Sequence, residues 1–213
     1  MDFLWIVFQT LLLVLALALD GFVCSLSYGA NKIKIPMKSI TMIAVITTAL
    51  LGIGVIFAQF LSGFLPEGLL DWLPFIILFI LGTSKIFDGA IKSLIRKRGV
   101  DKHFEFSLFS LGFILKVFAT YEEADADHSK YLSLKEAIPL AVALGLDGLG
   151  VGFSIGFMAP NLLLLLGLAF IVKFLCVHGG AVIGHTLAKK VSFDLSILSG
   201  LILVAIAFYE LFG

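Results

Sequence analysis

The stretch Ala16–Gly21, with the sequence ALALDG, returns almost unchanged as Ala143–Gly148, with the sequence ALGLDG. At the same offset, the two copies also agree at the pairs Ser27/Ser154 and Gly29/Gly156. Low-complexity apolar sequence alone would not preserve the same acid, serine and glycine positions. We therefore interpret the two copies as equivalent helices in two related halves of the chain.

The composition is that of a membrane protein. Of the 213 residues, 60 % are hydrophobic and 14 % are charged, whereas soluble domains are nearer one half apolar and one quarter charged. The apolar residues form runs of the roughly 20 residues that a helix needs to cross the hydrocarbon core. The net charge is zero and indicates no acidic or basic partner, and no nucleic acid is expected.

An all-α integral membrane fold with six transmembrane helices is expected. The predicted helices are Phe3–Tyr28, Ile40–Leu65, Trp72–Leu94, Glu136–Met158, Leu162–Lys189 and Leu195–Phe212. The two copies lie in the first and fourth helices, an offset of three crossings, so the second half must cross the bilayer in the opposite direction. The chain thus divides into a three-helix repeat (1–94), a cytoplasmic linker with an amphipathic helix (95–135) and a second repeat (136–213). Such 3+3 inverted repeats are typical of secondary transporters.

Lysine and arginine predict the orientation of the helices. The connections after the first, third and fifth helices are basic, whereas residues 66–71 and 159–161 contain neither residue type. Positively charged connections remain in the cytoplasm. We therefore expect both termini outside and the three basic connections inside.

Two acids lie well inside the predicted helices. A charged side chain at the bilayer centre costs at least about 2.5–3.5 kcal/mol, and packing alone does not offset this cost for Asp20 and Asp147. Cys24 and Ser27 share a helix face with Asp20, as Ser154 does with Asp147. Oxygen ligands suit Mn²⁺, Mg²⁺ or Ca²⁺. These five residues form the predicted midplane cation site, with the two carboxylates as its main ligands.

Small residues at a spacing of four run beside both acids. They are Gly21, Ser25 and Gly29 in the first helix and Gly148, Gly152 and Gly156 in the fourth. Such stripes allow helix backbones to approach closely in lipid. We expect them to cross the first and fourth helices and to hold the two carboxylates together, where a cation or proton must separate them.

The alternative is a pair of neutralised or ion-paired acids. Lys173, near the middle of the fifth helix, is the candidate counter-ion. His178 in the same helix is a weaker candidate ligand. Lys85 and Asp88 lie closer to the cytoplasmic end of the third helix, three residues apart. A local salt bridge or snorkelling explains them without a functional role.

The linker contains a second metal signature. Counted from Asp125, its oxygens have the spacing of an EF-hand calcium loop. The predicted ligands are Asp125, Asp127, Ser129, Tyr131 (through its carbonyl), Ser133 and Glu136. Lys130 stands where the motif requires glycine. The alternative is an acidic turn that starts the fourth helix at Ser133 and Glu136.

The repeated LDG core, the 3+3 layout and Gly82–Ile86 (GTSKI) resemble the bacterial manganese efflux pump (MntP) family. Ala124–Ser129 (ADADHS), which leads into Lys135–Ala137, is closest to the sporulation membrane protein (YtaF) branch of that family. The resemblance covers nearly the whole chain. It implies a lysine-exporter-type fold, a bacterial cytoplasmic membrane and key roles for Asp20 and Asp147. In the exporter it implies coupled metal export without ATP; for the sporulation branch, transport is implied only by relationship.

The predicted function is divalent-cation transport, with efflux of Mn²⁺ as substrate and no enzymatic activity. No nucleotide-binding motif is present, so an ion gradient is the expected driving force. One rival is a non-transporting membrane sensor or scaffold of sporulation, whose cytosolic loop binds Ca²⁺ or Mn²⁺. Another is an exporter of a small organic solute such as an amino acid. The expected partners are the lipid bilayer and a divalent cation, with a homodimer and a spore-associated membrane left open.

Overall fold

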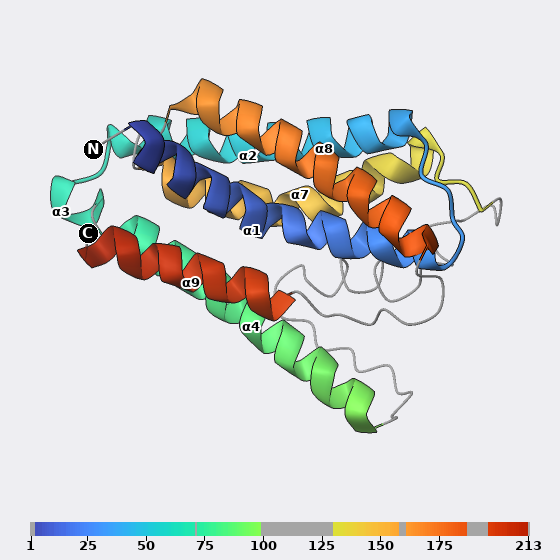
Figure 1. Ribbon diagram of the computed structural model, residues 1–213. Helices are drawn as coiled ribbons and strands as arrows, with labels where there is room; N and C mark the ends of the chain where they lie inside the picture. Colours follow the sequence, from blue (N-terminus) through green and yellow to red (C-terminus); the bar gives the residue numbers. More distant parts are fainter. Residues whose placement is uncertain (1–2, 71, 99–129, 158–160, 187–195, 213) are drawn as a thin grey trace.

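The computed structural model describes residues 3–70, 72–98, 130–157, 161–186 and 196–212 (Figure 1). Within these ranges the secondary structure is helical, apart from one isolated bridge between Lys34 and Tyr131. The helices are α1 (Phe3–Ala30), α2 (Met37–Ser62), α3 (Glu67–Leu70), α4 (Leu73–Arg98), α7 (Leu134–Gly156), α8 (Leu162–Thr186) and α9 (Ser196–Phe212). The six long ones coincide with the six predicted helices, with ends that differ by at most four residues. The predicted amphipathic helix of the linker lies outside the described residues.

Four of the described helices, α1, α2, α7 and α8, are long and apolar enough to cross a membrane. In α4 the apolar part is the shorter segment Leu73–Phe87, and α9 has 17 residues. The first and last described residues lie at the same end of the bundle (Figure 1).

The helices pack in pairs that join the first part of the chain to the second. The most extensive contacts are those of α1 with α8, α2 with α7 and α4 with α9. The first two pairs form a four-helix group, because α2 also contacts α8. The α4–α9 pair lies along one side of this group and touches it through α1 and α7 (Figure 1). Buried apolar residues from both units, including Val14, Leu78, Val151 and Leu203, form one core cluster.

Glycine contacts explain why these pairs pack so closely. A side-chain methyl group added to Gly29 of α1 would lie 2.7 Å from the backbone nitrogen of His185 in α8. One added to Gly156 of α7 would lie 2.6 Å from the backbone oxygen of Val55 in α2. At both positions, only glycine permits the observed approach of the two backbones.

The predicted partners of the small-residue stripes were therefore wrong. The stripe of α1 packs against α8 and that of α7 against α2, whereas α1 and α7 have little contact with each other. The facing helices contribute their own small residues, Gly180 and Gly184 in α8 and Gly54 in α2. A close backbone contact requires small residues on both surfaces, and sequence spacing within one helix does not identify its partner.

Backbone hydrogen bonds tie the connection between α1 and α2 to the segment before α7. The Lys34 amide donates to the Lys130 carbonyl at 2.9 Å, and the Leu132 amide donates to the Lys34 carbonyl at 3.0 Å. The buried Ser39 hydroxyl donates to the Leu132 carbonyl at 2.8 Å. Leu132 itself is fully buried. These bonds fix the start of α7 against the start of α2.

Helix α7 begins with a capping box. The Ser133 hydroxyl accepts from the Glu136 amide, and a Glu136 carboxylate oxygen accepts from the Ser133 amide at 2.8 Å and the Ser133 hydroxyl at 2.7 Å. This arrangement satisfies amide groups that a helix start otherwise leaves without a partner.

Replacing Gly180 and its neighbour Gly179 tests the packing of α1 on α8. A methyl group at Gly180 would overlap the Ser25 hydroxyl and lie 2.5 Å from the Phe22 carbonyl, whereas one at Gly179 would meet nothing within 4 Å. We expect Gly180→Ala to destabilise the protein by about 1–3 kcal/mol. Gly179→Ala should be neutral or stabilising by up to about 1 kcal/mol. Denaturation of the purified proteins in detergent measures both changes in stability. Equal effects of the two substitutions would contradict the observed packing of α1 on α8.

The cap of α7 gives a second stability test. We expect Ser133→Ala to destabilise the protein by about 0.5–2 kcal/mol, because the hydroxyl that accepts from the first turn is lost. Ser133→Thr retains both the donor and the acceptor of the hydroxyl and should remain near the parent stability. The same denaturation measurement applies; if alanine and threonine were equivalent, the cap would have no role.

Candidate functional site

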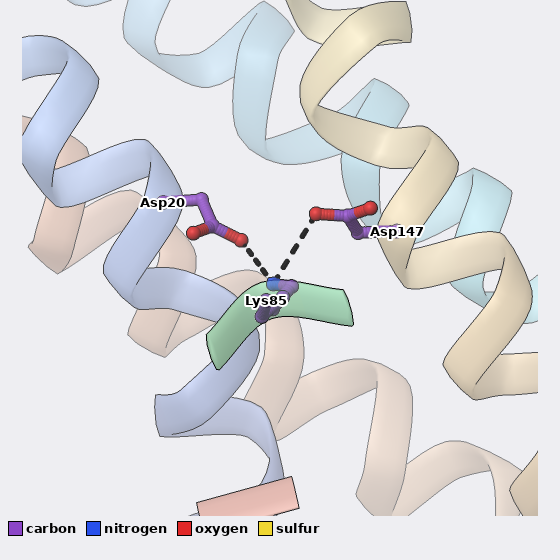
Figure 2. A network of polar contacts seen from close by, with 3 residues as sticks. All are labelled: Asp20, Lys85 and Asp147. Carbon is purple, nitrogen blue, oxygen red and sulfur yellow. Dashed lines mark hydrogen bonds and ion pairs between the residues drawn. The ribbon is translucent and has the colours of Figure 1, made fainter. Parts of the chain in front are cut away.

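Three charged side chains from three helices meet inside the bundle (Figure 2). Asp20 lies on α1, Lys85 on α4 and Asp147 on α7. The Lys85 ammonium donates to the Asp20 carboxylate and lies 3.2 Å from an oxygen of Asp147. Figure 2 shows the two carboxylates approaching the ammonium from opposite sides. The predicted meeting of the two acids is present, although α1 and α7 hardly touch.

The ammonium is the most enclosed part of this cluster. The Lys85 side chain is 11 % exposed, against 23 % for Asp20 and 32 % for Asp147. In low-dielectric surroundings, two neighbouring carboxylates repel each other strongly unless a cation lies between them. Lys85 supplies that cation, and both acids remain partly accessible.

A second buried lysine lies beside the cluster without joining it. Lys173 of α8 is 5 % exposed, and its ammonium donates to the Thr47 carbonyl at 2.9 Å. A methyl group at Gly148, the residue after Asp147, would lie 3.5 Å from this nitrogen. With both lysines and both acids ionised, the formal charges of the group cancel.

Lys85, and not Lys173, is therefore the counter-ion of the two acids. Lys173 makes no ion pair with either acid, because its ammonium is bound to a main-chain carbonyl of α2. The local explanation of Lys85 was incomplete, since its ammonium reaches across to α1 and α7. The side chain of Asp88 lies outside the described residues.

The sequence contained a signal for Lys85. The predicted third helix, Trp72–Leu94, has its middle at residue 83, so Lys85 lies near the bilayer centre by the same argument as the acids. Because Asp88 offered a local partner on the same helix, the position of Lys85 near the middle of that helix was overlooked.

The two predicted serine ligands do not join the carboxylates. Ser27 donates to the Val23 carbonyl of its own helix at 3.0 Å, and Ser154 donates to the Pro74 carbonyl of α4 at 2.8 Å. A separation of seven residues places each serine on the same helix face as its acid but about 10 Å further along the axis. That distance is several times a metal–oxygen bond, which is about 2.0–2.6 Å.

Cys24 lies in apolar surroundings and His178 lies against an aromatic ring. Cys24 is buried in an apolar cluster with Tyr28, Ile43 and Val177, and the His178 ring stacks on Phe174. Among the described residues, no group of three or more histidine, cysteine, aspartate or glutamate side chains is arranged to hold a metal ion. Of the acids whose side chains are described, Asp20 and Asp147 are the two that contact the Lys85 ammonium.

The predicted EF-hand loop lies partly outside the described residues, which do not include Asp125, Asp127 and Ser129. Lys130 has the positive φ of 57° that the sixth position of the motif requires, but Lys32 in another connection has a φ of 62°. Glu136 and Ser133 form the capping box, and Tyr131 is exposed. The loop as a metal site stays a prediction.

The family model described as "Mntp: Putative manganese efflux pump" matches residues 53–211. A "Probable sporulation protein YtaF" of Bacillus subtilis (strain 168) is 29 % identical, over 94 % of this chain and 97 % of the relative. A "Putative manganese efflux pump MntP" of Campylobacter hominis is 28 % identical, over 94 % of each chain. The protein of the same name from Clostridium perfringens (strain 13 / Type A) is 26 % identical, over 89 % of this chain and 86 % of the relative.

No solved structure matches the chain significantly. The matched residues of the family model include Lys85 and Asp147, and the relatives extend over nearly the whole chain. The resemblance indicated by the repeated LDG core is thereby confirmed: the chain belongs to the family described as "Putative manganese efflux pump".

Proposed function

We propose that this chain is an efflux transporter for a divalent cation, with Mn²⁺ as its substrate, and that the ion binds between Asp20 and Asp147. The observation that carries the proposal is the approach of these two carboxylates, from α1 and α7, to one cation position inside the bundle. Relatives named as manganese efflux pumps support the choice of substrate.

The two carboxylates match the chemistry of such an ion. Together they carry two negative charges, and hard divalent cations such as Mn²⁺ prefer carboxylate, carbonyl and water ligands. Both acids are partly exposed, so water can complete the coordination shell. A site with two protein carboxylates and several waters binds weakly enough to release its ion, as transport requires.

The pairing of the helices supports an inverted repeat. If the halves are related by a two-fold axis, α1, α2 and α4 correspond to α7, α8 and α9. That exchange converts the α1–α8 contact into the α7–α2 contact and leaves the α4–α9 contact unchanged, which is the observed set of pairs. In transporters of this kind, the substrate lies near the midplane where the repeats meet, and access alternates between the two sides.

The proposed setting is the cytoplasmic membrane of a bacterium, with both termini outside. Both ends of the described chain lie at one end of the bundle, and the basic connection after α1 lies at the other (Figure 1). Basic connections favour the cytoplasmic side. An ion gradient would then supply the driving force.

Replacing either acid tests the proposal. Asp20→Asn and Asp147→Asn each remove one of two charged ligands, so we expect Mn²⁺ transport in reconstituted vesicles to fall by at least about tenfold. Ser27→Ala, on the same helix as Asp20 but about 10 Å away along its axis, should keep transport within about twofold. Melting temperatures of all variants identify any loss that comes from misfolding.

The same vesicles separate the rival functions. A wild-type protein that moves no Mn²⁺ would favour the sensor or scaffold of sporulation; the name of the Bacillus subtilis relative connects that protein with sporulation. Transport of an amino acid in place of Mn²⁺ would favour the organic-solute exporter. Either result would overturn the proposal.

A further inference from the structure

We infer that the Lys85 ammonium is a tethered cation that occupies the substrate position in the empty transporter, and that the metal ion must displace it. The inference rests on the proposed function and adds to it a competitor for the site and a consequence for helix packing. Three features of the structure carry it: the position of the ammonium, the balance of charge around it and the helix from which it comes.

The ammonium already lies where a divalent ion would bind. It is within ion-pairing distance of both Asp20 and Asp147, and the two carboxylates point toward it from opposite sides (Figure 2). A metal ion bonded to both acids needs oxygen distances of about 2.0–2.6 Å. The same space cannot hold the metal and the ammonium, so binding of one excludes the other.

Charge balance also favours exchange over simple addition. Asp20, Asp147, Lys85 and Lys173 have formal charges that cancel, and both lysines are buried. A divalent ion added to this group would leave two positive charges in excess in low-dielectric surroundings, which is costly. Moving the Lys85 ammonium away from the acids reduces the repulsion that the incoming ion meets.

Lys85 belongs to a different packing unit from the acids. It lies on α4, which packs mainly on α9, whereas Asp20 and Asp147 belong to the four-helix group. Nearer the start of α4, Leu78 and the bond from Ser154 to the Pro74 carbonyl hold the two units together. The last part of α4 runs away from the other described helices (Figure 1).

The ion pairs of Lys85 therefore hold α4 against the acids of the four-helix group. If a metal ion takes the place of the ammonium, this contact is lost while the contacts near Pro74 remain. Binding of the substrate would then allow the α4–α9 pair to move relative to the four-helix group. Movement of this kind is what alternating access requires.

Binding of Mn²⁺ to purified protein in lipid nanodiscs tests the competition. We expect Lys85→Met to bind Mn²⁺ at least about tenfold more tightly than the wild type, because the competing cation is gone. Lys85→Arg retains the charge and should stay within about threefold of the wild type. Lys173→Met removes a buried positive charge but leaves the ammonium between the acids, so its gain in affinity should be clearly smaller than that of Lys85→Met.

Two results would overturn the inference. One is equal or weaker binding by Lys85→Met; the other is an equal gain from Lys173→Met, which would indicate general charge repulsion in place of occupancy. If Lys85→Met is unstable, its melting temperature must rise more with Mn²⁺ than that of the wild type, and an equal rise contradicts competition. If Mn²⁺ transport in vesicles depends on Asp147, the proposed function stands even if the inference about Lys85 fails.

Distances between spin labels test the release of α4. Labels at Phe87 of α4 and Val182 of α8 report on the two units, and labels at Val45 of α2 and Val182 are the control within the four-helix group; all three side chains are exposed. The native cysteines are replaced by alanine. We expect Mn²⁺ to shift the first distance and not the second. Lys85→Met should show the shifted distance without metal, and an unchanged first distance in both cases would contradict the release.

Discussion

An ammonium held between two carboxylates is the interaction on which the rest of the structure depends. Each charged group alone would be costly inside hydrocarbon, and the two acids would repel each other if nothing lay between them. The Lys85 contact removes both difficulties and joins α1, α4 and α7 at one point. It also defines a cation position between two carboxylates that are partly exposed. A site that exchanges ions needs such access.

Close packing of small residues supplies the rigid surroundings of that position. In α1 and α8, and again in α2 and α7, glycines allow the backbones to touch, and larger side chains at those points would separate the helices. The acids of α1 and α7 therefore face each other across a gap instead of lying in a helix contact, and the side chain from α4 fills that gap. The same glycine stripes would keep the four-helix group together while α4 moves.

Much of the fold could be predicted from the sequence, because hydrophobic runs and repeated motifs are local signals. The six long helices and the approach of Asp20 to Asp147 followed from apolar length and from the repeated LDG core. The partners of the glycine stripes did not, since a stripe shows that a contact is close without showing which helix makes it. The role of Lys85 was missed for a related reason: an acid three residues away suggested a local pair, whereas its ammonium contacts acids on two other helices.

The two serines were predicted as metal ligands, but they lie too far along their helices from the acids. A spacing of seven keeps Ser27 and Ser154 on the faces of their acids, but a helix rises about 1.5 Å per residue, and a metal site is only a few ångströms wide. We propose that the transported ion takes the place of the Lys85 ammonium between Asp20 and Asp147. Anomalous scattering from crystals soaked in Mn²⁺ tests it directly. We predict a peak between the two carboxylates with the ammonium moved away; a peak elsewhere alone, with the ammonium still between the acids, would contradict the claim.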